Sequence, residues 1–170
     1  VDDQPVVAHP QPARVVAAAA DGDGHVRAHP RAHRPRHVML VGTPEDGRRV
    51  AVLVNNTGGP PPGPAHEADV QAFERAFRLH LLAYQTLVRA VVPGMKAAGH
   101  GRIINVISTS VKQPLPNLGV SNTIRGAVAQ WSKTLANELG PFGITVNNVL
   151  PGATATERLA TIIRDRSAKA

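Results

Sequence analysis

Residues 102–107 have the sequence RIINVI, a short apolar run with β-branched side chains that predicts a buried strand. Two runs of the same kind flank it in the chain: VAVLV at 50–54 and ITVNNVL at 144–150. Each run is followed by small and polar residues, which is typical of a strand that ends in a loop. The three runs therefore predict three buried strands.

Helical patterns occupy the segments between these runs. Asp69 can cap a first helix whose apolar stripe repeats at spacings of three and four. That stripe consists of Val70, Phe73, Phe77, His80, Tyr84, Leu87 and Val91. Pro93 is expected to end or kink this helix. A second helix is predicted over residues 119–139, and a third is expected to begin after Thr156.

The alternation of strand and helix predicts an α/β fold with a parallel sheet and right-handed crossovers. In such a sheet a ligand binds beyond the carboxyl ends of the strands. Those ends fall at residues 55–59, 108–110 and 151–156, which are small, polar or glycine residues. The sequence therefore predicts a binding site where these three segments meet.

Residues 1–49 differ in composition from residues 50–170. They are rich in Ala, Arg, His and Pro, and their clearest apolar run is HVMLVG at 37–42. The tract HVRAHPRAHRPRH at 25–37 could bind a metal or phosphate, but its prolines prevent the histidines from sharing one helical face. We therefore expect a poorly ordered or degenerate segment over 1–49, a single domain over 50–170, and no metal site.

Composition narrows the classes of function. The chain has 170 residues and no cysteine, so thiolate chemistry and disulfides are excluded. It has no apolar run of about 18 residues and no recognisable secretion signal, so a cytoplasmic protein without a membrane partner is expected. The net charge of +7 comes mostly from residues 51–170, where the basic residues are spread singly, which favours a solvated surface over a nucleic-acid interface.

Residues 50–160 resemble the short-chain dehydrogenase/reductase family. The segments LVNNTGG, GRIINVIS and KTLANELGPFGITVNNVLPGATAT match family elements in order and spacing. The resemblance implies a Rossmann-like, doubly wound parallel sheet of which the second half is recognisable. It also implies NAD or NADP as cofactor and a small carbonyl or alcohol as substrate.

The resemblance assigns roles to particular residues. It gives the active-site serine role to Ser108 and the helix-asparagine role, which relays protons, to His80. The catalytic tyrosine and lysine positions are those of Ser121 and Arg125. The positions implied to contact the cofactor are Asn55, Thr57, Gly58, Arg125, Pro151, Gly152, Thr154 and Thr156.

The residues at positions 121 and 125 differ from the family pattern. A phenol has an ordinary pKa near 10, whereas a serine hydroxyl is a far weaker acid, so Ser121 is a poor proton carrier. Ser121 as a helix N-terminal residue or cap is the favoured interpretation. Arg125 keeps the charge of lysine but differs in shape, so a ribose contact and a solvated helix charge both stay open. For His80 and Tyr84, the only tyrosine, core positions are favoured over a proton-carrying role.

A glycine-rich phosphate-binding turn is not recognisable, since GGPPPG at 58–63 has prolines where N–H donors are needed. Family members are also longer, so a truncated member, incomplete at both ends, is expected. The sequence thus predicts an impaired NAD(P)-dependent oxidoreductase. The alternatives are a non-catalytic subunit or binding module and a non-functional fragment. A homo-oligomer through helices 70–92 and 119–139 is expected.

Overall fold

The computed structural model describes residues 15–20, 26–28, 38–41 and 50–153. Its strands are β1 Val15–Ala20, β2 Val26–Ala28, β3 Val38–Val41, β4 Val52–Asn55, β5 Gly101–Val106 and β6 Ile144–Val149. Its longer helices are α1 Val70–Phe77, α2 Ala83–Ala98 and α3 Gly119–Leu139. Short helical turns are η1 Ala65–Glu67, η2 Arg78–Leu82, η3 Thr109–Val111 and η4 Gly140–Phe142. No helix in these described ranges is long and apolar enough to cross a membrane.

The strands form one six-stranded sheet in the order β2-β1-β3-β4-β5-β6. β4, β5 and β6 run parallel, which confirms the predicted α/β fold and its three buried strands. β1, β2 and β3 extend the sheet from β4 through antiparallel pairs. The run at 37–42 corresponds to β3, whereas β1 was not predicted because its sequence, VVAAAA, is mostly alanine, a weak strand former. The remainder of residues 1–49 lies outside the described residues, so the expectation of poor order there stays a prediction.

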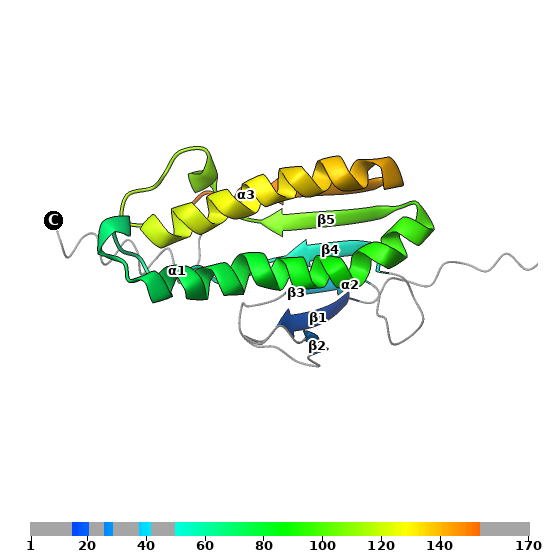
Figure 1. The fold of residues 1–170 in the computed structure, drawn as a ribbon, viewed down its shortest axis with the longest axis horizontal. Helices are drawn as coiled ribbons and strands as arrows, with labels where there is room; N and C mark the ends of the chain where they lie inside the picture. Colours follow the sequence, from blue (N-terminus) through cyan, green and yellow to red (C-terminus); the bar gives the residue numbers. More distant parts are fainter. Residues whose placement is uncertain (1–14, 21–25, 29–37, 42–49, 154–170) are drawn as a thin grey trace, which may run out of the picture.

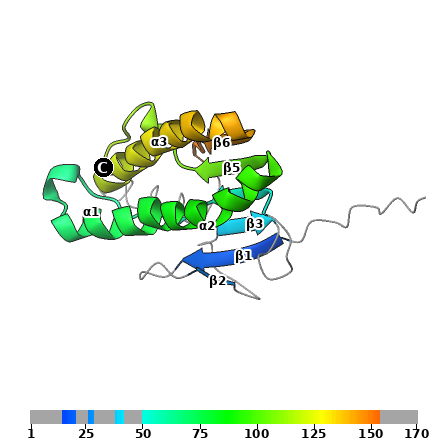
Figure 2. The ribbon, with the colours of Figure 1, turned by 45° about the vertical axis from the view of Figure 1, so that its right-hand side comes forward.

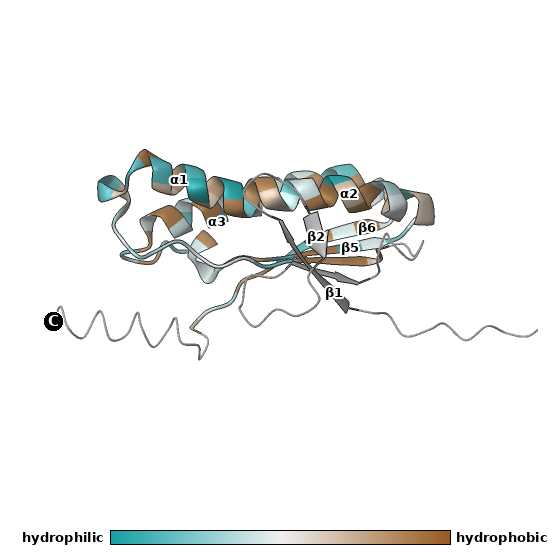
Figure 3. Cartoon of the chain, turned by 90° about the horizontal axis from the view of Figure 1, so that it is seen from below, coloured by the Kyte–Doolittle hydropathy of each residue, from teal (hydrophilic) through white to brown (hydrophobic). Residues whose placement is uncertain are grey.

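The three segments α1, η2 and α2 form one uninterrupted helical run from residue 70 to residue 98. This run lies beside α3 in both ribbon views (Figure 1 and Figure 2). Figure 3 shows both on the same side of the sheet. A doubly wound sheet carries helices on both faces, and the helices of the described residues account for one of them.

The helical run departs from its predicted boundaries at Pro93. Of the two outcomes expected at Pro93, an end of the helix was wrong, because α2 continues through it to Ala98, and a kink there stays a prediction. Pro93 lies on the exposed side, while Val91 and Met95 on the opposite side are buried in the core. Their burial offsets the lost hydrogen bond. The helix ends instead at Gly99, whose φ of 60° is the left-handed conformation of a C-cap.

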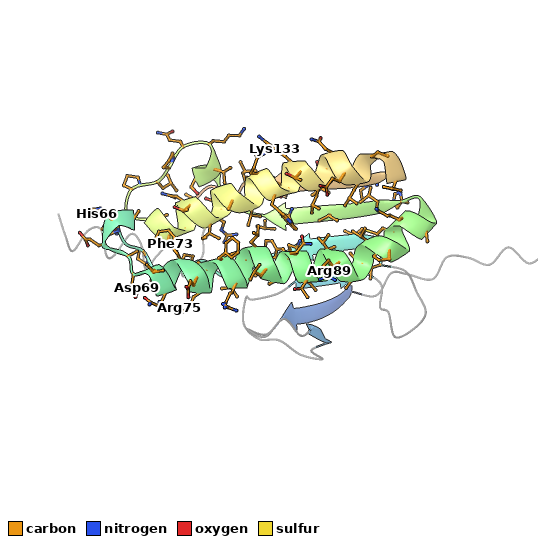
Figure 4. All side chains as sticks on the ribbon, viewed as in Figure 1. His66, Asp69, Phe73, Arg75, Arg89 and Lys133 are labelled. Atoms are coloured by element: carbon orange, nitrogen blue, oxygen red, sulfur yellow. The ribbon has the colours of Figure 1, made fainter. Side chains whose placement is uncertain are left out.

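The predicted apolar stripe is buried only where the sheet lies beneath it. His80, Tyr84, Leu87 and Val91 are buried, as expected. Val70 and Phe77 are 69% and 38% exposed, because α1 extends beyond the tips of β4 and β5 (Figure 1). Phe73, labelled in Figure 4, packs instead in the cluster formed by Ala76, Val120 and Ile124 between α1 and α3.

A row of asparagines crosses the parallel strands under the helices. Asn55, Asn105 and Asn148 occupy paired positions on β4, β5 and β6. The side-chain amide of Asn55 donates to Asn105 at 2.7 Å, and that of Asn105 donates to Ser132 Oγ of α3 at 2.8 Å. Because both Asn55 and Asn105 are fully buried, these bonds offset the cost of placing amides in an apolar core. The ladder fixes the strand register at the last residue of β4 and one residue before the ends of β5 and β6.

The start of α3 depends on close backbone contact with the loop after β4. Gly119 donates to the carbonyl of Gly63 at 2.9 Å, and Gly63 donates to the carbonyl of Asn117 at 2.8 Å. A Cβ at position 119 would lie 2.3 Å from the backbone nitrogen of Ala65. Glycine at 119 therefore allows this loop to dock against α3.

We predict that Gly119→Ala will lower the free energy of unfolding by about 1–3 kcal/mol, because backbone atoms must move to admit the methyl group. Gly126→Ala on the same helix is the control, since a Cβ there meets no atom within 4 Å. Gly126→Ala should be neutral or stabilise the helix by up to about 1 kcal/mol. Urea unfolding followed by circular dichroism measures both. Equal effects of the two substitutions would contradict the proposed role of Gly119.

Candidate active site

Hydrogen bonds beyond the carboxyl ends of β5 and β6 join the two loops that follow these strands. The backbone N–H of Ile107 donates to Val149 at 2.9 Å, and that of Thr109 donates to Pro151 at 3.2 Å. The loop after β5 is therefore held against the loop after β6. The structure thus brings together the predicted segments that follow the strands, as far as residue 153.

Arg125, on α3, links the end of β5 to the loop after β4. Its guanidinium donates to the carbonyl of Val106 at 2.8 Å and to the carbonyl of Thr57 at 3.2 Å. Arg125 is only 8% exposed, so the solvated helix charge considered from sequence was wrong. A buried cation of this kind requires hydrogen-bond acceptors, and the ends of two strands provide them.

Ser121 lies one turn before Arg125 on the buried side of α3. It is in the first turn of the helix, but the N-cap residue is Leu118, which makes no side-chain capping bond. Ser121 is therefore an N-terminal helix residue and does not cap the helix. With 8% exposure it brings a hydroxyl, and no phenol, to this edge of the sheet.

Ser108 stands directly beyond β5, at the N-cap of the η3 turn. Its hydroxyl oxygen accepts a hydrogen bond from the backbone N–H of Ser110 at 3.1 Å. This bond fixes the serine side chain at the strand end and uses an acceptor site on the oxygen, so the hydroxyl proton can still be donated. Ser108 is partly exposed, which a group that contacts a ligand requires.

His80 lies within η2, the π-helical turn between α1 and α2. Single π turns inside α-helices occur frequently at functional sites. The Nδ1 atom of His80 makes a short hydrogen bond with the hydroxyl of Thr57, and the same hydroxyl lies 2.8 Å from the phenol oxygen of Tyr84. Thr57 thus connects two side chains from adjacent turns of the helical run.

Tyr84 also lies close to the guanidinium of Arg125. Tyr84 is fully buried, and this burial raises the pKa of its phenol above 10, although Thr57 and the charge of Arg125 act in the opposite direction. The phenol is therefore protonated at neutral pH. The sequence favours a core position for Tyr84 but does not predict that it lies close to Arg125. Its being the only tyrosine and its place one turn after His80 are the signals that point to it.

A cavity of about 220 Å³ lies between the loop after β4 and the helical run. It is lined by Gly58, Gly59, Pro60, Pro61, Ala72, Arg75, Ala76, Leu79 and His80. Arg75 projects from α1 on the side away from α3, where its guanidinium lies 3.6 Å from the carboxylate of Asp69 (Figure 4). His80 thus links the half-buried Thr57 to the lining of this cavity.

The remaining predicted cofactor residues occupy different environments. Asn55 is fully buried, and its side-chain amide is committed to the asparagine row. Pro151 is partly exposed and Gly152 is exposed at the joined strand ends. Thr154 and Thr156, with the predicted last helix, lie outside the described residues. In the described ranges no three His, Cys, Asp or Glu side chains form a cluster that could hold a metal.

Curated proteins with similar sequences are dehydrogenases and reductases. The chain is 38% identical over 118 residues to trans-4-hydroxycyclohexanecarboxylate dehydrogenase of Sinomonas cyclohexanicum, covering 66% of this chain and 43% of that protein. It is 28% identical over 150 residues to the NADPH-dependent reductase BacG of Bacillus subtilis, covering 88% and 54%. The chain spans about half the length of the curated relatives it matches.

Solved structures show the same relationship. L-Sorbose reductase from Gluconobacter frateurii, in complex with NADPH and L-sorbose, superposes with a TM-score of 0.65 at 32% identity, over 71% of this chain and 46% of that chain. A gluconate 5-dehydrogenase from Burkholderia cenocepacia, in complex with NADP and tartrate, has a TM-score of 0.65 at 27% identity, over 70% and 47%. The family model for short chain dehydrogenases matches residues 37–167. The chain therefore belongs to the short-chain dehydrogenase family.

Proposed function

We propose that this chain is an NAD(P)-dependent oxidoreductase that acts on a small carbonyl or alcohol, with impaired proton transfer. Membership of the short-chain dehydrogenase family supports the reaction class. The structural neighbours in complex with NADP or NADPH support a nicotinamide cofactor of either kind. The observation that carries the proposal is the joined edge of the sheet, where Ser108, Arg125 and the turn at Pro151 meet.

The residues at this edge fit the nicotinamide end of such a cofactor. The turn at Pro151 and Gly152 is fixed against Thr109, and among the described residues a Cβ at Gly152 would meet Thr109 at 3.9 Å, an ordinary van der Waals contact. The cofactor supplies or accepts the hydride. Ser108 orients the substrate oxygen through its hydroxyl proton, and Arg125 provides positive charge. Asn55, Thr57 and Gly58 contact the adenosine part of the dinucleotide. Thr154 and Thr156 contact its carboxamide and phosphate groups.

Proton transfer is impaired because of the residues at positions 121 and 125. Ser121 has no acidic proton, and two donors of Arg125 are already bound to backbone carbonyls. These bonds also favour a second candidate function, a non-catalytic family member that serves as a subunit or binding module. In that case the strand ends are stabilised by Arg125 and no hydride is transferred.

A fluorescence titration of the full chain with NADH and NADPH separates these functions. We expect saturable binding of at least one dinucleotide in the micromolar to millimolar range typical of metabolic enzymes. We further expect Ser121→Tyr combined with Arg125→Lys to raise turnover of a carbonyl substrate panel by about 10²-fold or more, as for a restored general acid. The control is Ser121→Phe with Arg125→Lys, which adds the ring without its hydroxyl.

Absence of binding up to millimolar dinucleotide would refute the oxidoreductase proposal and leave the non-catalytic function. Binding without turnover in the restored variant, but with a native circular dichroism spectrum, would show that the substrate site is also lost.

We also propose that the chain forms homo-oligomers through the helical run and α3. The support is the exposed apolar surface of the run, where Leu79 and Leu82 are 38% and 42% exposed. Leu82→Glu should reduce the mass in light scattering to that of the 17.9 kDa monomer. Leu115→Glu, at 39% exposure in the loop after η3, is the control and should leave the mass unchanged. A monomeric wild-type chain would contradict this proposal.

A further inference from the structure

The cavity between the loop after β4 and the helical run is lined mostly by apolar side chains. Pro60, Pro61 and Leu79 contribute apolar surface, and the small side chains of Ala72 and Ala76 leave room beside α1. None of these side chains carries a hydrogen-bonding group, so together they suit a flat ring. At about 220 Å³ the cavity is smaller than the roughly 300–1,000 Å³ of sites for drug-sized ligands. It therefore takes one end of a dinucleotide and not the whole molecule.

Arg75 supplies a permanent positive charge to this cavity. It is a lining residue together with Gly58 and Gly59 of the loop after β4. The other lining side chain that can carry charge, His80, is fully buried and is hydrogen-bonded to Thr57. A guanidinium has five donors in a planar fork that matches the oxygens of a phosphate. The lining therefore combines space for a ring with one cation that can bind a phosphate group.

The carboxylate of Asp69 leaves Arg75 able to bind an anion. It lies 3.6 Å from the guanidinium, but the side chains of Asp69 and Arg75 are 63% and 69% exposed. Exposed ion pairs contribute little stability, so a phosphate can displace this one. Asp69 is also the N-cap of α1, where its side chain accepts a hydrogen bond from the N–H of Ala72, and it does not line the cavity. A ligand in the cavity therefore meets the cation of Arg75 and not the carboxylate of Asp69.

We propose that Arg75 binds the 2′-phosphate of NADPH, so that the chain prefers NADPH to NADH. This inference rests on the oxidoreductase function proposed above, in which Gly58 contacts the adenosine part of the dinucleotide. The two dinucleotides differ in one group of the adenosine ribose, which is a phosphate in NADPH and a hydroxyl in NADH, and a nearby arginine accommodates the phosphate. Arg75 determines the choice of cofactor and takes no part in hydride transfer.

The preference is tested by titrating the full chain with NADPH and with NADH, followed by nicotinamide fluorescence. We expect NADPH to bind at least about tenfold more tightly, as for a charge-assisted contact to phosphate, and Arg75→Gln to abolish this difference by weakening NADPH alone. Arg78→Gln is the matched control, because Arg78 is an exposed arginine of the same helical run that does not line the cavity. Equal affinities of the wild-type chain for the two dinucleotides, or an unchanged preference in Arg75→Gln, would overturn the proposal.

The substitution Asp69→Asn tests which of the two charged groups a ligand meets. Asparagine keeps a capping oxygen for α1 but removes the carboxylate that competes for Arg75. We expect NADPH to bind about two- to fivefold more tightly to this variant, the effect of losing an exposed ion pair, and NADH to bind as it does to the wild-type chain. Weaker binding of NADH would show that Asp69 holds the ribose hydroxyl and would overturn the assignment to Arg75.

Two isomers of adenosine monophosphate separate this inference from the oxidoreductase proposal. The 2′ and 5′ isomers have the same composition and charge, and neither carries nicotinamide. In titrations followed by the amide NMR signals of Gly58 and Gly59, the 2′ isomer should bind about tenfold more tightly to the wild-type chain and to Arg78→Gln but not to Arg75→Gln. This preference without any dinucleotide binding would refute the oxidoreductase proposal alone. Dinucleotide binding without this preference would overturn the role of Arg75 alone.

Discussion

A permanently charged guanidinium buried at 8% exposure is stable only when its donors are satisfied, and Arg125 satisfies them at the ends of two strands. One donor binds the last residue of β5 and another binds the loop after β4. Since the N–H of Thr109 joins β5 to the loop after β6, the three strand ends form one continuous edge. The position of every group at the candidate site depends on this connection.

The same guanidinium contacts the one phenol of the chain. In this family the proton-carrying phenol and the cation share a single helix, one turn apart, whereas here position 121 holds a serine. Tyr84 projects from the facing helical run and reaches Arg125 across the gap between the two helices. The phenol and the cation of the family's pair are thus present on two different helices of this chain, which motivates the impairment proposed above.

The fold was predictable where local sequence agrees with tertiary structure. The apolar runs around 52–55, 101–106 and 144–149 predict strands, which the structure confirms. The alternation of these runs with two helical stripes predicts that the strands are parallel. Tertiary packing decided the rest. Burial on either side of Pro93 carries α2 through the proline, and pairing with β3 makes a strand of an alanine-rich segment.

The sequence predicts which segments form the site but not which of their side chains contact one another. The strand ends identified the edge at which Ser108 and Arg125 lie. No spacing rule could show that Arg125 turns inward to carbonyls or that Tyr84 contacts it, because both depend on how α3 is rotated against the helical run. The π turn that positions His80 likewise leaves no simple pattern in the sequence.

The central claim is that Arg125 holds the strand ends together through its two carbonyl bonds. The most direct test is the free energy of unfolding of Arg125→Met beside Arg89→Met, an exposed arginine on α2 (Figure 4). We expect Arg125→Met to lose about 2–4 kcal/mol, since a charged hydrogen-bond donor is removed and two half-buried carbonyls lose this partner. Arg89→Met should change stability by no more than about 0.5 kcal/mol. Equal values for the two variants would contradict the account.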